Sequence, residues 1–429
     1  MLLVYTHKIT PRLNYIFKQI FVRILKTPVS FTTEVSKFVA FNGPKITYTK
    51  TPLGKEFFIR NHPLLFEQGI SDVAIALSTW EDIPAFFATG EQSSIPFDIF
   101  AASFYLISRY EEYQPYVADT NDRFSAEQSA AFQGGFLERP LVDIWAYKLL
   151  DRLKERFPDY DFPSREYQAI STINVKETFA YKHKGIIRSL IGFIKDLGSF
   201  NFKSFSRRFT VLLGYKKDPN RSFQEIIDIE KKYNIETIFF FLFSKFSTYD
   251  TNVSSTNIKH RLLIKSIIDY ASFGQLFSYY TMKSVHKLNK EKTLFEDLVN
   301  RPVSKSRQHY NRLEIPKTYQ NLIDVGIEED YSMGYYTHAG FRASTCTPFY
   351  FYDLDYEIQT PLLIFPFACN DETFQLQKMT VNETLLHIKV LQNEVRKVGG
   401  TFISIFHNSS LSDMPQNKPW KDLYEQIFK

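Results

Sequence analysis

The part of the chain from residue 168 onward alternates short apolar runs with longer amphipathic segments. The apolar runs predict strands at 168–175, 236–244, 272–280, 302–309, 360–368 and 400–407. The amphipathic segments predict helices at 222–233, 257–270, 285–299, 317–325 and 381–397. Thr380 and Glu383 form a capping-box pattern before the last helix, and two glycines follow it. Because strands that alternate with helices build mostly parallel sheets, we expect a parallel sheet that is closed or nearly closed into a barrel.

The chain before this region shows a different pattern, with helical apolar spacing in two long segments, 95–116 and 134–157. A polar loop joins the two segments, and a stretch rich in proline and aspartate ends the second. The length of 429 residues exceeds the usual size of one domain. We therefore predict an N-terminal α+β domain at 1–160 and a second domain at 166–429.

Charge and motif content exclude several classes of protein. Lysine and arginine are interleaved with acidic residues at a net charge of +5, so no nucleic-acid partner is expected. Cys346 and Cys369 are too few for a disulfide framework or a cysteine-rich zinc site, and we expect two free thiols in a reducing compartment. No glycine-rich phosphate loop and no nucleophile elbow occurs, which disfavours nucleotide-dependent and serine-hydrolase chemistry.

The beginning of the chain lacks the features of a secretory signal. Charged residues such as Lys8 and Arg12 interrupt its apolar segment, and no run elsewhere reaches the roughly 20 apolar residues of a membrane span. We expect a cytoplasmic protein without a transmembrane segment. The stretch from Tyr15 to Leu25 is amphipathic enough to lie on a membrane surface, but packing within the first domain is the favoured interpretation.

The predicted strand ends show where to look for chemistry, because barrels of this kind carry their reactive groups at the C-terminal ends of the strands. Polar or aromatic candidates at these ends are Asn174, Lys176, Ser278, Tyr279, Arg307, His309, Phe365, Phe367, His407 and Asn408. Few of them can do acid–base or metal chemistry.

Several stretches resemble the polysaccharide deacetylases of the NodB-homology type, in their two-domain bacterial form. They are "FYLISRYEEY", "FLERPLVDIWAYKLL", "AYKHKG", "SKSRQHYNRLEIPKTYQNLIDVGIEEDYSMGY", "GFRASTCTPFYFYDL" and "GTFISIFHNSSL". The resemblance implies a C-terminal deformed (β/α) barrel, a place in surface-glycan metabolism and hydrolysis of N-acetyl groups on a sugar polymer. In that chemistry a zinc-like metal activates water, an aspartate acts as base, and aspartate and histidine hold the metal.

This chain departs from the family pattern at the decisive positions. Where the family has Asp-x-Asp after the first strand, the chain has Asn174 and Lys176, and Leu276 replaces a family histidine. A neutral amide is no anionic base, and an ammonium group repels a cation. A His-Pro-Phe pattern is likewise replaced by Phe365, Pro366 and Phe367.

Some candidate site residues survive these losses. The resemblance implies His407 as the late acid and His309 as a metal ligand, and Asp371 is a second catalytic candidate. Arg307, Arg342 and Tyr279 are candidates for substrate binding. Each has a structural alternative, such as a buried histidine bonded to backbone or an arginine that braces a loop. Lys176 either takes the vacated metal position and pairs with Asp371 or an anionic sugar, or is a solvated loop lysine.

Other candidates favour a structural role. Glu111 and Glu112 are adjacent on a helix and cannot face one another, so packing or interdomain salt links are expected. Cys346 is more typical of a structural loop than of a nucleophile.

Three functions stay open at this point. The first is a deacetylase-like protein that has lost its metal and binds a carbohydrate, a glycan intermediate or a protein partner in polysaccharide biosynthesis, with no cofactor. The second is an active N-deacetylase with a rearranged site that uses His309, His407 and a divalent metal. The third is a protein whose first domain carries the function while the barrel is a scaffold. Loss of both acids and an imidazole favours the first.

Overall fold

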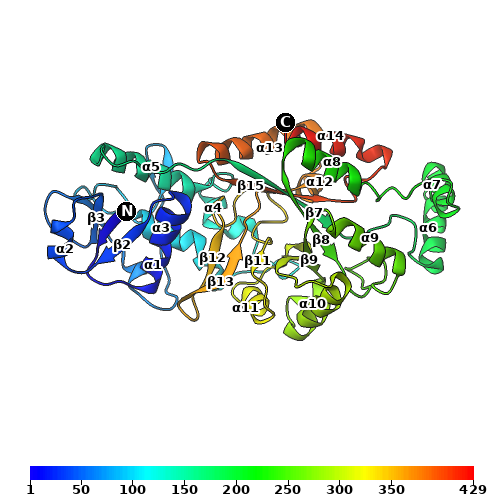
Figure 1. Ribbon diagram of the computed structural model, residues 1–429, viewed down its shortest axis with the longest axis horizontal. Helices are drawn as coiled ribbons and strands as arrows, with labels where there is room; N and C mark the ends of the chain where they lie inside the picture. The colour runs from blue at the N-terminus through cyan, green and yellow to red at the C-terminus, as the bar shows by residue number, and fades with distance from the viewer.

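The computed structural model describes residues 1–429 as a mixed α/β structure built on two main sheets (Figure 1). The smaller sheet lies near the N-terminus and has four parallel strands in the order β2-β1-β3-β4. Its strands are β1 (Leu2–Tyr5), β2 (Val29–Thr32), β3 (Lys45–Thr49) and β4 (Phe57–Arg60). The hairpin of β5 (Ser78–Trp80) and β6 (Ile83–Ala85) and the helices α1 (Pro11–Phe17), α2 (Val35–Ala40), α3 (Ile99–Ile107), α4 (Ala130–Gln133) and α5 (Leu141–Arg156) complete this part.

The amphipathic stretch near the N-terminus packs inside the protein. Thr10 caps α1, and the helix runs on into a π-helical turn, Lys18–Ile24. Except for Val22, the apolar side chains of this segment are buried in the core, and Phe17 stacks on Phe100 with ring centroids 3.7 Å apart. Packing within the first part of the chain, the favoured interpretation, is therefore confirmed.

The larger sheet has nine strands in the order β12-β13-β11-β10-β9-β8-β7-β15-β14. They are β7 (Gln168–Val175), β8 (Glu236–Leu242), β9 (Ser272–Phe277), β10 (Lys305–Gln308), β11 (Glu329–Asp330), β12 (Phe349–Asp353), β13 (Ile358–Ile364), β14 (Cys369–Asn370) and β15 (Thr401–His407). All neighbours are parallel except β12 and β13. The predicted parallel α/β sheet is confirmed.

The helices beside this sheet largely match the predicted ones. They are α6 (Ile186–Gly198), α7 (Phe202–Leu212), α8 (Phe223–Tyr233), α9 (Ile258–Ile268), α10 (Val285–Val299), α11 (Lys317–Asp324), α12 (Asp371–Leu376), α13 (Val381–Lys397) and α14 (Lys418–Gln426). The capping box of Thr380 and Glu383 at the start of α13 is present as predicted. Helices α6, α7, α12 and α14 were not among the predicted elements.

The sheet curls but does not close by hydrogen bonds, so the predicted barrel is not confirmed. Strand β13 is next to the edge strand β12, and β14 is the edge strand on the opposite side of the sheet. Only residues 365–368 separate β13 from β14 in sequence. A connection of this length spans at most about 18 Å, which keeps the two sides of the sheet near each other. The predicted strand 360–368 ends early because the chain crosses this gap.

The hydrophobic core has two parts. A cluster of 92 buried residues runs through both sheets and their helices. A separate cluster of 9 lies on the inner face of the larger sheet and consists of Ile170, Ile238, Phe240, Leu242, Leu276, Tyr331, Phe367, Ile403 and Ile405. Because alternate residues of a strand share a face, the side chains that follow this cluster along β7 and β15 are Asn174 and His407. The small cluster therefore forms the floor of the strand-end region.

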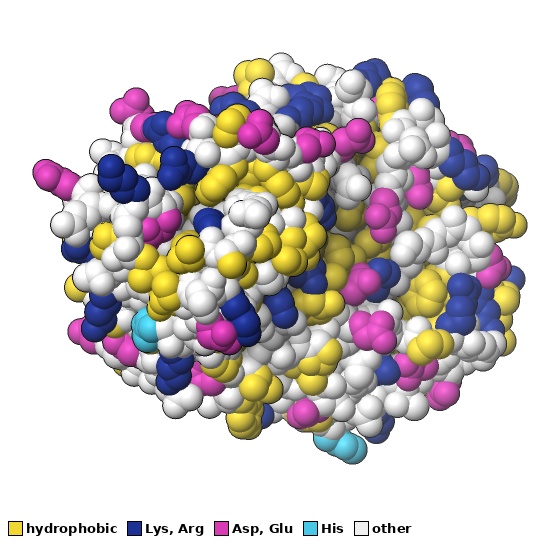
Figure 2. All heavy atoms as spheres, turned by 60° about the vertical axis from the view of Figure 1, so that its left-hand side comes forward, with side chains coloured by type: hydrophobic (Ala, Val, Ile, Leu, Met, Phe, Trp, Pro, Cys, Tyr) yellow, Lys and Arg dark blue, Asp and Glu magenta, His cyan; other side chains and the backbone are white.

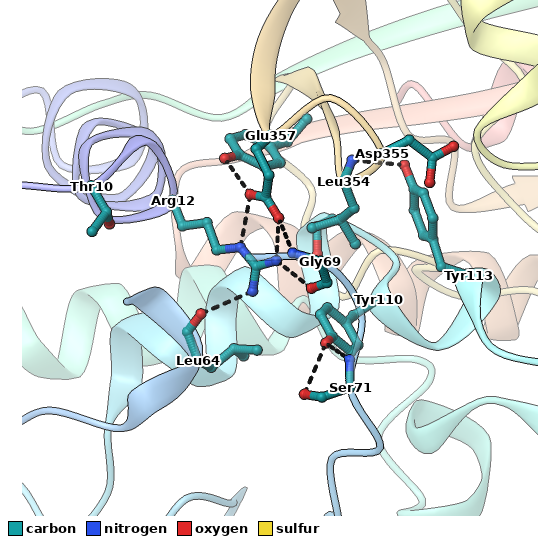
Figure 3. A network of polar contacts seen from close by, with 12 residues as sticks. Thr10, Arg12, Leu64, Gly69, Ser71, Tyr110, Tyr113, Leu354, Asp355 and Glu357 are labelled. Carbon is teal, nitrogen blue, oxygen red and sulfur yellow. Dashed lines mark hydrogen bonds and ion pairs between the residues drawn. The ribbon is translucent and has the colours of Figure 1, made fainter. Parts of the chain in front are cut away.

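Figure 3 shows a polar network that joins the first part of the chain to the turn between β12 and β13. Arg12, 1% exposed, forms an ion pair with Glu357, and it donates to the carbonyls of Leu64 and Gly69 at 3.0 and 2.6 Å. Next to this ion pair, the backbone amide of Leu354 donates a hydrogen bond to the Tyr113 hydroxyl. The two parts are thus held by buried polar contacts, while the boundary between 1–160 and 166–429 stays a prediction.

Charges of both signs are mixed over the face of the molecule seen in Figure 2. No helix of the protein has the length and apolar character that a bilayer crossing requires. Cys346 and Cys369 are buried free thiols, as predicted, and burial raises the pKa of both. A buried thiol held in its neutral form is a poor nucleophile.

The buried His260 on α9 gives the fold a pH dependence that one variant can isolate. Its Nδ1 lies 2.8 Å from the Thr178 hydroxyl, and burial lowers the pKa of His260 to about 4. In the unfolded chain this pKa is about 6.5, so the stability held by the neutral imidazole is complete above that pH and is lost as the pH falls toward 4. We expect a loss of about 2 kcal/mol by about pH 5.

The variant His260→Gln should lack this part of the acid dependence. The measurement is urea unfolding of both proteins at about pH 7 and about pH 5. Equal losses of unfolding free energy in the wild type and the variant would contradict the assignment.

Candidate functional site

Three predicted residues meet where β7, β10 and β15 end. Strands β7 and β15 pair in parallel with Asn174 opposite His407. Arg307, on β10, donates from one Nη to the Asn174 side-chain oxygen at 3.0 Å and to the Thr172 hydroxyl at 2.8 Å. Its Nε donates to a carbonyl at 2.9 Å, and its second Nη has no partner. Arg307 is thus a fully buried cation whose partners are neutral oxygens, and burial lowers its pKa.

His407 and Asp371, both predicted as catalytic candidates, form a pair that the sequence did not suggest. Asp371 starts α12, and its carboxylate lies 2.6 Å from His407 Nδ1 and accepts from the His407 amide at 2.9 Å. His407 Nε2 lies 3.2 Å from the Asn174 amide nitrogen. With the Asn174 oxygen turned to Arg307, its nitrogen donates to Nε2, and Nδ1–H therefore donates to Asp371. Hydrogen bonds thus run from Arg307 through Asn174 and His407 to Asp371.

Lys176 carries its ammonium group into the same strand-end region. Its Nζ lies 2.6 Å from a Glu372 oxygen and 5.7 Å from the ring centre of Tyr310. Burial opposes ionisation of Glu372, but the neighbouring His407 and Lys176 lower the pKa of Glu372 to about 2. Glu372 follows Asp371 in the first turn of α12, where the helix dipole favours carboxylates. The carboxylate that pairs with Lys176 is therefore Glu372, and not Asp371, which was one of the alternatives considered for it.

His309 lies at the end of β10 and pairs with an acid that the sequence did not single out. His309 Nδ1 is 2.8 Å from Asp250, while His309 Nε2 is buried without a partner. Burial lowers the pKa of His309 to about 4, although the hydrogen bond with Asp250 opposes the shift. The imidazole is thus neutral near neutral pH. Asp250 also accepts from the backbone amide of Tyr279 at 3.1 Å.

The residues present do not fit a divalent metal ion. No three His, Cys, Asp or Glu side chains gather in a way that could hold one. His309 Nε2 is an orphaned nitrogen of the kind a metal uses, but the Lys176 charge lies near it and Asn174 offers only a neutral amide. A zinc-like ion needs several anionic or imidazole ligands, and these residues do not supply them.

Leu276 and Arg342 lie apart from this polar group. Leu276 is fully buried in the small apolar cluster beneath the strand ends. Arg342 is also buried and binds both oxygens of Glu112, at 2.9 and 2.5 Å. The salt link predicted for Glu112 is therefore present, and the guanidinium of Arg342 is engaged by that carboxylate.

Tyr279 belongs to an aromatic group next to the site. Its ring stacks on Tyr249 at 3.8 Å, with Arg312 over it at 3.8 Å, and its hydroxyl donates to Asn121 at 3.3 Å. Its exposed fraction is only 8%. Tyr280 beside it is the more accessible ring, with 45% exposed.

Two half-buried tyrosines that sequence reasoning did not assign to the strand ends complete the region. Tyr310 has a left-handed backbone (φ 60°), and its ring contacts the Lys176 ammonium. Tyr336 lies close enough to Glu372 for that charge, after burial, to raise its pKa. Tyr336 also lines a cavity of about 170 Å³ together with Asp119, Arg123, Phe124, Ser125, Glu127, Asn311, Gly334, Tyr335, Thr337 and Arg342. A left-handed backbone at a non-glycine residue, such as that of Tyr310, is often found at functional sites.

The missed residues gave weak signals in the sequence. Glu372 directly follows a predicted site residue, and its position at the start of α12 was hidden because this short helix was not predicted. Asp250 lies in the loop after β8, beyond the strand end that was searched. Tyr310 lies in a stretch that carried the family resemblance, and Tyr336 directly follows that stretch, but neither has an acid–base pattern.

Comparison with known proteins gives one family match and distant structural likenesses. A family of unknown function, DUF7033, matches residues 2–158. No curated protein matches the chain. This family match covers the first part of the chain and carries no activity.

The similar solved structures include members of the CE4 group at low identity. A protein assigned as a polysaccharide deacetylase from Mycobacterium smegmatis is 11% identical, with a TM-score of 0.38 over 63% of this chain and 86% of that one. A CE4 family pseudoenzyme from Bacillus anthracis is 13% identical, with a TM-score of 0.30 over 62% and 63%. A 4-alpha-glucanotransferase from Thermococcus litoralis is 13% identical, with a TM-score of 0.37 over 62% and 37%.

Proposed function

We propose that this chain is a polysaccharide-deacetylase-like protein of bacterial surface-glycan metabolism that binds carbohydrate and lacks metal-dependent hydrolysis. The observation that carries the proposal is the ion pair of Lys176 and Glu372, 2.6 Å apart at the strand ends. This ion pair supports the proposal because Lys176 occupies a position where the resemblance implies an aspartate ligand, and because it engages the nearby carboxylate of Glu372. A deformed barrel, a cytoplasmic location, absence of a cofactor and a partner in polysaccharide biosynthesis belong to the same proposal.

The polar and aromatic groups near the strand ends suit a sugar ligand. Tyr310 and Tyr336 are half-buried, so part of each ring is accessible to stack on the apolar face of a sugar ring. Lys176 and Glu372 are each 24% exposed and offer a donor and an acceptor for hydroxyl groups. The cavity beside Tyr336, about 170 Å³, is smaller than common small-molecule sites of about 300–1,000 Å³. It suits a single sugar unit of a longer chain.

The experiment is a calorimetric titration with N-acetylhexosamine oligosaccharides, together with an assay for released acetate. We expect binding without acetate release, and a drop in affinity of about tenfold in Tyr336→Ala because a stacked ring is lost. The control is Tyr356→Ala, which removes a ring that is 67% exposed on the turn between β12 and β13. Absence of binding, or an equal drop in the control, would contradict the proposal.

An active N-deacetylase with a rearranged site is the second candidate. The pair of His407 and Asp371 favours it, because a carboxylate at Nδ1 orients an imidazole for proton transfer at Nε2. In this arrangement Nε2 accepts from Asn174, so donation from His407 would first require its protonation. Acetate release that is lost in His407→Ala, or a tightly held divalent metal that is lost in His309→Ala, would establish this candidate.

A further inference from the structure

A helical hairpin of α6 and α7 stands at the end of the molecule opposite the N-terminal sheet (Figure 1). It carries an unusual number of exposed apolar side chains: Ile186, Ile187, Leu190, Ile191, Ile194, Leu197, Phe200, Phe202, Phe209, Leu213 and Tyr215. The exposed fraction reaches 75% at Ile187, 71% at Ile194 and 81% at Phe200. Helix α6 has no buried residue at all. Exposed apolar surface of this kind marks a site of interaction.

The exposed apolar residues follow helical spacing. On α6, Ile187, Leu190, Ile191, Ile194 and Leu197 recur at intervals of three and four residues, so they share one face. The other face carries the contacts between the two helices. There Asp196 accepts from Arg208 at 2.7 Å, and the rings of Phe193 and Phe205 lie 5.0 Å apart. The hairpin therefore holds together without its exposed face.

The segment that contains the hairpin is strongly basic. Residues 181–221 have ten lysine and arginine residues and two aspartates, a net charge of +8. The remainder of the chain has 42 basic and 45 acidic residues, a net charge of −3. The whole positive balance of the protein thus lies in this segment, in contrast to the mixed charges of Figure 2. A partner with an apolar interior and an anionic surface is complementary to it.

A basic cavity of about 690 Å³ lies at the base of the hairpin. Its charged lining is Lys182, Lys216, Lys217, Arg221, Lys259 and Asp218. The Asp218 carboxylate accepts from the backbone amides of Ala180, Tyr181 and Lys182, so both of its oxygens already have backbone partners. The exposed side chains of Leu262 and Tyr215 also line the cavity, and they bring apolar surface beside its positive charge.

We propose that the α6–α7 hairpin docks the protein on an anionic phospholipid membrane. The apolar face enters the interface between headgroups and acyl chains, and the basic cavity receives a lipid phosphate. With 13 residues α6 is about 20 Å long, which suits a helix that lies along the surface. The proposal does not depend on the carbohydrate site, which lies at the strand ends of the larger sheet.

The test is sedimentation of the full chain with vesicles of phosphatidylcholine alone and of phosphatidylcholine mixed with phosphatidylglycerol. We expect sedimentation with the mixed vesicles and release by salt, because the attraction to the anionic surface is screened. The double variants Ile187→Ser with Ile194→Ser, and Lys216→Glu with Lys217→Glu, should each weaken binding by at least about tenfold. Their native side chains are exposed, so the variants should fold, which circular dichroism checks.

Matched controls come from another helix and another loop. Leu386→Ser with Val390→Ser removes exposed apolar side chains from α13, and Lys50→Glu with Lys55→Glu reverses exposed charges. Neither control should change vesicle binding. Failure of the wild type to sediment with anionic vesicles overturns the proposal. The proposal is also overturned if the wild type is a dimer that does not bind vesicles and the Ile187→Ser with Ile194→Ser variant is a monomer. A second copy of the chain would then cover this face.

Discussion

Replacing Glu112 by glutamine is expected to lower the free energy of unfolding by about 3–5 kcal/mol. Glu112 is 3% exposed and accepts from Arg109 at 2.7 Å and from Arg342 at 2.9 and 2.5 Å. The variant keeps the shape of the side chain but leaves the buried Arg342 without a counter-charge and Arg109 with Glu111 alone. Since Arg342 lies 230 residues further along the chain, the change also loosens the contact between the two parts of the protein.

The measurement is denaturant unfolding of the variant and of a control, Glu155→Gln. Glu155 pairs with Arg152 on the surface, with its side chain 65% exposed, and pairs of this kind contribute about 0–1 kcal/mol. A loss in Glu112→Gln no larger than that in the control would show that the buried network is not a main source of stability.

The double replacement Asn174→Asp with Lys176→Asp is expected to create a divalent-metal site. It removes the ammonium group, releases Glu372, and adds two carboxylates near the Nε2 atoms of His309 and His407. Carboxylate and imidazole together are the ligands that zinc prefers. We expect affinity for Zn²⁺ to rise by at least about a hundredfold, or about 2.8 kcal/mol, as measured by titration calorimetry.

The single variant Asn174→Asp is the matched control. Its new carboxylate would lie beside the Arg307 guanidinium, which is 3.0 Å from the Asn174 oxygen, and Lys176 would still be present. We therefore expect little gain in zinc affinity. Leu276 is left unchanged because it belongs to the apolar floor, where an added imidazole would be buried without a partner. If the double variant binds zinc no better than the control, the strand ends are not a former metal site.

The alternation of apolar runs and amphipathic segments was enough to place the main strands of the larger sheet. Strands β7, β8 and β15 are buried along nearly their whole length, and continuous apolar runs of this kind are visible in sequence. Strands β11 and β14 have two residues each, too few for any periodic signal. The α6–α7 hairpin was not among the predicted elements, although the apolar residues of α6 recur at helical spacing in the sequence.

The candidate site, like the fold, could be predicted from the sequence only in part. Asn174, Arg307 and His407 could be brought together from sequence because strand ends of a parallel sheet meet at one edge. The partners of Lys176 and His309 could not, because Glu372 and Asp250 lie beyond the strand ends in a short helix and a loop. Their positions depend on how the connections fold back, which no local pattern specifies. The deacetylase resemblance likewise suggested a barrel, and the sheet curls without closing.

The zinc content and zinc affinity of the purified wild-type chain test most directly whether Lys176 has replaced a metal ion at the strand ends. Because the Lys176 ammonium pairs with Glu372 at the strand ends, where the resemblance implies metal ligands, we predict no stoichiometric zinc and no tight binding in a titration. One equivalent of zinc held by the wild-type chain and lost in His309→Ala would contradict this account and establish a metal-dependent enzyme.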